Sequence, residues 1–97
     1  MNMNAFTESL SKDSPPEKLT PALTALWYDA KGDWSAAHDL INDMSGKDEA
    51  WVHAYLHRKE GDIGNAGYWY RRAGKELCNL SLQEEWNKIT EALLRND

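Results

Sequence analysis

Apolar residues recur every three or four positions along most of this chain of 97 residues, and Gly, Asp or Pro separates the runs. Because an α-helix completes a turn in about 3.6 residues, this spacing collects apolar side chains on one helical face. The clearest runs fall within residues 19–30, 34–44, 51–56 and 82–93. The pattern therefore predicts an all-α fold.

Short joins between the runs predict helical hairpins. Gly32 and Gly61 each stop a helix, and the aspartate that follows each glycine can cap the next helix through its carboxylate. So short a join makes consecutive helices antiparallel neighbours. We predict one hairpin over residues 20–46 and another over residues 48–74, the latter capped at its start by Asp48.

The second helix of the latter hairpin has an unusual composition. It contains Gly64 and Gly67, each of which costs about 1 kcal/mol relative to alanine, so we expect a neighbouring helix to pack closely against them. The consecutive aromatics Tyr68, Trp69 and Tyr70 span about 200° of a helix and cannot all face one direction. We expect Tyr68 to be the exposed member.

Two further segments flank the hairpins. Residues 1–18 carry few apolar side chains and contain a Pro-Pro pair, so we predict a flexible or partly helical segment. Ser81 and Glu84 form a capping box that begins a last helix over residues 81–95. Its narrow apolar stripe, typical of a terminal capping helix, consists of Leu82, Trp86, Ile89 and Leu93. Residues 19–97 are expected to form a single helical-repeat domain.

The two predicted hairpins superpose at an offset of 29 residues, with identities at the turn, the cap and the small packing positions. The identical pairs are Ala25 with Ala54, Gly32 with Gly61, Asp33 with Asp62 and Ala37 with Ala66. Because a repeated hairpin should keep these positions, we interpret the pattern as a repeat.

The repeat resembles the tetratricopeptide family over residues 20–74. Repeats of that family carry a small residue and an aromatic on the first helix, and an alanine and an aromatic on the second. The matching residues are Ala25, Tyr28, Ala37, Ala54, Ala66, Tyr70 and Ala73, with Ile41 in an aromatic position. The chain departs in its period of 29 rather than 34 residues, in His57 at an aromatic position, and in lacking the opening Trp and Leu and the closing proline. The resemblance implies two hairpins stacked as a short right-handed array, closed by the C-terminal helix.

A second resemblance concerns the central stretch, residues 50–74. Its strings HAYLHRKEGD and NAGYWYRRAG are similar to those of a group of small bacterial and fungal proteins. This resemblance implies no activity, but it indicates that the central stretch is the part of the chain most worth testing.

Charge, cysteine content and motifs narrow the function classes. Lys and Arg number 11 against 16 Asp and Glu, and the net charge of −5 opposes binding to nucleic-acid phosphates. The lone Cys78 has no partner for an internal disulfide, so we expect a reducing, cytoplasmic setting. No apolar segment approaches the ~20 residues that span a bilayer, and no signal-peptide pattern opens the chain, so we expect no membrane role. Without a nucleophile arrangement or a phosphate-binding glycine loop, we expect a non-enzymatic protein with no cofactor.

The binding function that we expect first is recognition of a protein or peptide in a groove formed by the first helices of the hairpins. Aromatic and Arg side chains supply most of the binding energy at such interfaces. The expected binding residues are Trp51, Tyr55, Arg58, Lys59, Tyr68 and Arg71. The same excess of aromatic surface could instead drive homodimerisation.

The sharpest alternative site consists of His53, His57 and Glu60. At positions i, i+4 and i+7 they share one side of a helix, where two imidazoles and a carboxylate could hold a transition metal or a small ligand, or perform acid–base chemistry. A remaining metal ligand would have to come from His38 or Asp29. In the tetratricopeptide alignment both central histidines fall at helix-packing positions, which favours buried, hydrogen-bonded structural histidines over a metal site.

Overall fold

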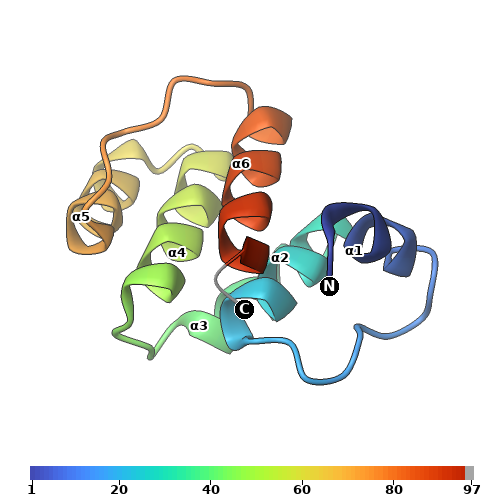
Figure 1. The fold of residues 1–97 in the computed structure, drawn as a ribbon. Coiled ribbons are helices and arrows are strands. Elements are labelled where there is room, and N and C mark those ends of the chain that lie inside the picture. The colour runs from blue at the N-terminus through green and yellow to red at the C-terminus, as the bar shows by residue number, and fades with distance from the viewer. Residues whose placement is uncertain (96–97) are drawn as a thin grey trace.

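The computed structural model describes residues 1–95, which form six helices and no strands (Figure 1). The helices are α1 (Met3–Ser9), α2 (Pro21–Ala30), α3 (Trp34–Ile41), α4 (Lys47–Lys59), α5 (Ile63–Ala73) and α6 (Leu82–Arg95). The predicted all-α fold is confirmed. Residues 96 and 97 of the expected 19–97 domain lie outside the described part of the chain. Within residues 1–95, no helix has the length and apolar content needed to cross a membrane.

Two turns with the same geometry join α2 to α3 and α4 to α5. Gly32 and Gly61 adopt φ values of +87° and +88°, in the left-handed region that glycine enters without strain. The carboxylates of Asp33 and Asp62 then accept the backbone N–H three residues later, at 3.0 and 3.2 Å. As a result α2 packs on α3, and α4 packs on α5.

The start of α4 differs from the prediction that Asp48 caps it. The helix begins at Lys47, two residues earlier than a cap at Asp48 would place it, and its N-cap is Gly46, which makes no side-chain capping bond. Asp48 lies inside the first turn beside Glu49. Carboxylates there interact favourably with the free N–H groups of the helix end, so Asp48 acts through charge instead of as a cap.

Helix α6 packs against both α2 and α4, and it lies between them in Figure 1. The Trp86 Nε1 donates a hydrogen bond to the Leu26 carbonyl at 3.0 Å, which joins residues 60 positions apart. The predicted stripe of this helix is wrong at Leu82, which is 36% exposed in the first turn, and it leaves out Glu85, which is only 1% exposed. Because α6 contacts three helices, α1, α2 and α4, its buried arc is wider than the predicted stripe and includes a carboxylate.

The N-terminal segment contributes a short helix to the core. Asn2 caps α1 by accepting the Ala5 N–H at 2.8 Å. Phe6 is fully buried and lies against Trp86 of α6, with ring centroids 6.0 Å apart. Of the two alternatives for residues 1–18, the partly helical one therefore describes residues 3–9.

The glycines inside α5 do not serve close helix packing. A Cβ placed on Gly64 would meet no atom within 4 Å, and one on Gly67 would meet only the Arg71 Nη1 at an ordinary 3.5 Å. The expectation that a neighbour needs the missing side chains is wrong, because the face of α5 that carries both glycines has no helix against it.

Gly67→Ala is expected to raise the free energy of unfolding by about 0.5–1 kcal/mol, since alanine loses less conformational freedom in a helix and meets no obstacle here. Denaturant unfolding measures the change. Gly61→Ala is the matched control: it places a Cβ at φ +88° and should lower the same quantity by about 1–2 kcal/mol. Destabilisation by Gly67→Ala would contradict the open geometry around α5.

Candidate metal centre

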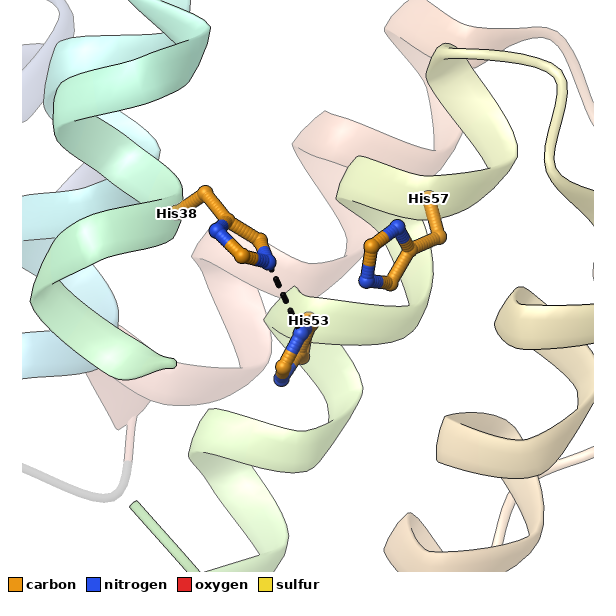
Figure 2. A group of neighbouring side chains, drawn as sticks. All are labelled: His38, His53 and His57. Carbon is orange, nitrogen blue, oxygen red and sulfur yellow. Dashed lines mark hydrogen bonds between the residues drawn. The ribbon is translucent and has the colours of Figure 1, made fainter. Parts of the chain in front are cut away.

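Three histidine side chains from α3 and α4 lie close together. His38 comes from α3, and His53 and His57 come from successive turns of α4. Figure 2 shows the three imidazoles turned toward one another. Their ring centroids are 4.8 Å (His38–His53), 5.2 Å (His38–His57) and 4.8 Å (His53–His57) apart. The structure thus adds His38, one of the two residues considered for the remaining ligand, to the predicted His53–His57 pair. It does not add Asp29.

Helix geometry explains how these residues meet. His53 and His57 are four residues apart and project from the same side of α4. His38 follows Trp34 by four residues, so the two share a side of α3. The Trp34 Nε1 donates a hydrogen bond to the Leu56 carbonyl at 2.8 Å, which holds that side of α3 against α4.

The spacing of the ring nitrogens suits a shared ion. The Nε2 atoms of His38 and His53 lie 3.1 Å apart, and one ligand atom of each of the three histidines lies within 4.8 Å of the others. Two nitrogens bound to one tetrahedral Zn²⁺ at 2.0–2.1 Å are about 3.3 Å apart. The first pair therefore already has nearly the spacing of two ligands, and His57 has to approach by at most about 1.5 Å.

Glu60 orients the third imidazole. Its Oε1 lies 2.7 Å from the His57 Nδ1, so the Nε2 of His57 is the nitrogen free to bind an ion. Histidines that bind metals commonly donate their other ring N–H to a carboxylate, which fixes the tautomer and raises the basicity of the ligating nitrogen. Glu60 was predicted as a ligand, whereas the structure places it behind His57 as an orienting group.

Stacked indoles orient the other two imidazoles. The Trp69 ring of α5 stacks on His53 with centroids 3.9 Å apart and planes 18° apart. Trp34 stacks on His38 at 4.8 Å and 8°. The Nδ1 of His53 is buried and has no hydrogen-bond partner among the described residues, so the stacking on Trp69 and the hydrogen bond between the Nε2 atoms of His53 and His38 set the angle of this ring. Trp34 was not among the predicted site residues.

Burial keeps two of the imidazoles neutral. It lowers the pKa of His53 to about 4, with further lowering from the neighbouring His57 and His38. Burial also lowers the pKa of His38, and His57 adds to this effect while Asp39 and Glu60 oppose it. Neutral imidazole is the form that binds metals, so at neutral pH neither ring has to lose a net proton first. The proton of the hydrogen bond between the two Nε2 atoms would have to move to the Nδ1 of the same ring.

The predicted peptide groove is not open. Trp51 and Tyr55 are only 7% and 2% exposed, which contradicts the expectation that they line a groove. Helix α6 covers the face of α2 and α4 where the groove was expected, and Lys75, from the segment after α5, lies 4.2 Å from the centre of the Trp51 ring. The chain's own C-terminal part therefore occupies the surface expected to bind a peptide.

The two basic residues expected in the groove neutralise buried carboxylates. The Lys59 Nζ lies 2.9 Å from the Asp29 Oδ1, and the Tyr55 hydroxyl donates to the other oxygen of that carboxylate at 3.0 Å. The Arg58 Nη1 donates to the Glu85 Oε1 at 2.8 Å. Both pairs tie α4 to a neighbouring helix, so Arg58 and Lys59 have structural partners inside the fold.

Tyr68 and Arg71 remain on the surface of α5. Tyr68 is 46% exposed, as expected for one of three consecutive aromatics, and Arg71 is exposed as well. The Arg72 guanidinium lies 5.8 Å from the centre of the Tyr68 ring. A protein-interaction role stays a prediction, with Tyr68 and Arg71 as the members of the expected set that are accessible to a partner.

One feature of the sequence indicates that His38 faces another helix. Trp34 begins the apolar stripe of its helix, and a residue four positions later must lie on the same side. His38 therefore lies on the buried side of its helix, and a neighbouring helix carries His53 and His57 on one side. This combination is the sequence signal for a cluster of three histidines. What the sequence could not show is that α3 lies against the His53–His57 side of α4.

Acidification is expected to destabilise the protein through His53. In the unfolded chain this imidazole takes a proton near pH 6.5, whereas in the folded state it does so only near pH 4. The unfolded state therefore binds more protons between these values, and the free energy of unfolding falls by up to about 3 kcal/mol as pH is lowered through the window.

Denaturant titrations at several pH values across that window, on wild type and His53→Phe, measure this effect. The variant keeps a ring against Trp69 but cannot take a proton, so it should lose clearly less stability on acidification. His38 still titrates in both proteins. Equal losses in the two proteins would contradict the lowered pKa of His53.

No protein-family model, curated protein or solved structure matches this chain. The resemblances to the tetratricopeptide family and to small bacterial and fungal proteins therefore stay predictions.

Proposed function

We propose that this protein binds a divalent transition-metal ion through His38, His53 and His57. The observation that carries the proposal is the convergence of three imidazoles from two helices, with ligand atoms within 4.8 Å of one another. Imidazole nitrogens suit Zn²⁺, Cu²⁺, Ni²⁺ and Fe²⁺, and three histidines are a known ligand set for zinc.

The surroundings of the three rings support this proposal. Each ring has a neighbour that sets its angle: Trp34 for His38, Trp69 for His53 and Glu60 for His57. The rings therefore reach the ion with little loss of side-chain freedom. A bound ion would also link α3 to α4, because its ligands come from both helices.

Zinc titration of metal-free protein tests the proposal. If zinc binds the folded protein and not the unfolded chain, it raises the free energy of unfolding by about 2.7 kcal/mol at a free zinc concentration 100-fold above the dissociation constant. This increase appears as a higher melting temperature. His38→Ala should lose most of this increase, and because His38 is only half-buried the variant is expected to fold. Cys78→Ser is the matched control and should bind zinc as wild type does, because the thiol lies outside the cluster.

Calorimetry gives the stoichiometry, for which one ion per chain is expected. Absence of binding by wild type to zinc, nickel, copper and iron(II), each at submillimolar concentration, would refute the proposal. Unchanged zinc binding by His38→Ala would place the ion elsewhere.

Trp69 is expected to contribute to affinity without touching the ion. Trp69→Leu removes the ring that stacks on His53 and should weaken zinc binding about tenfold, the lower end of what loss of an orienting neighbour costs. Trp69→Phe keeps an aromatic face and should bind nearly as wild type does. Ile63→Ala, on the same helix and 50% exposed, is the control. Equal affinities for the Leu and Phe variants of Trp69 would show that stacking has no such role.

A further inference from the structure

The three-histidine cluster provides fewer ligands than a tetrahedral ion takes. Within residues 1–95, the group formed by His38, His53 and His57 includes no fourth His, Cys, Asp or Glu. Structural zinc sites usually have four protein ligands, whereas sites with three keep a position for water or another small molecule. On this count, an ion held by the cluster keeps one open position.

Nearby carboxylates are already bound elsewhere. Glu60 is held by the Nδ1 of His57, on the opposite edge of the ring from the nitrogen that faces the cluster. Asp62 lies near these two groups, but its carboxylate caps α5 by accepting the Asn65 N–H. The group of three histidines includes neither carboxylate, so the residues that the structure describes, 1–95, supply no fourth His, Cys, Asp or Glu ligand.

The charge balance favours an anion as that ligand. Three neutral imidazoles leave the full double charge of a divalent ion uncompensated, and the nearest walls are the uncharged rings of Trp34 and Trp69. Glu60 supplies a negative charge across His57, and the exposed Asp39 next to His38 supplies a second one that water screens. Because charges interact more strongly where water is partly excluded, an incoming anion gains more here than at an exposed ion.

The burial of the ligands indicates the direction of access. His53 and His57 are 2% and 7% exposed, whereas His38 is half-buried. The position left open therefore faces solvent on the His38 side. We propose that the metal in this cluster binds a small exogenous anion, of the size of hydroxide, azide or a carboxylate, beside His38. This inference rests on the proposed metal-binding function.

Titration of cobalt-loaded protein with azide tests the inference. Co²⁺ replaces Zn²⁺ with the same ligands, and its visible absorption bands depend on the identity and number of those ligands. Millimolar azide is expected to shift these bands in a saturable manner, with one azide per cobalt. Azide added to Co²⁺ in buffer is the control, because the spectrum of protein-bound cobalt must differ from it.

The outcomes separate the two proposals. If wild type binds neither cobalt nor zinc, nickel, copper or iron(II), the metal-binding function itself is refuted. If cobalt binds and azide leaves its spectrum unchanged, or only removes the ion from the protein, the open position is refuted while metal binding stands. A saturable shift that persists in Cys78→Ser, together with loss of cobalt binding in His38→Ala, supports both.

Discussion

The structure depends on how the carboxylate of Glu85 is buried. Removing a carboxylate from water costs several kcal/mol unless charged and polar partners replace its hydration. Arg58 supplies a charged partner at 2.8 Å, and the Tyr70 hydroxyl donates to the second oxygen. Because Glu85 has to reach both partners at once, essentially one orientation of α6 offsets the cost of burying this carboxylate. The carboxylate therefore specifies the place of α6, whose apolar residues supply most of the burial.

The packing of α6 against α4 gives the two sides of α4 different roles. On one side, α4 holds α6 through Arg58, and Tyr55 and Lys59 hold the carboxylate of Asp29 on α2. On the other side, His53 and His57 meet α3 and α5. Eight consecutive residues of α4, 50–57, are buried, which is the pattern of a helix enclosed on all sides. Function is therefore expected on the α3 and α5 side, since α6 already occupies the other one.

The histidine cluster is an unfavourable choice for a core that only has to be stable. Apolar rings of the same shape would need no hydrogen bonds, whereas His53 has a buried nitrogen without a partner and a pKa lowered to about 4. Such departures from an optimal core occur most often at functional sites. Purely structural histidines would be expected to satisfy more of their ring nitrogens, whereas within residues 1–95 the three imidazoles make two side-chain hydrogen bonds, His38–His53 and His57–Glu60. Stacking on Trp34 and Trp69 provides the remaining order.

Local chemistry made the helices and their turns predictable from the sequence. A glycine at positive φ and an aspartate that caps the N–H three residues later act within one turn of the chain. The spacing of four residues that places His53 and His57 on one side of α4 is equally local. The contacts that join Trp86 to Leu26 and His38 to His53 span 60 and 15 residues. Apolar periodicity shows which side of a helix is buried but not which helix covers it. Only the tertiary structure therefore decided that α6 fills the expected groove and that a third histidine completes the cluster.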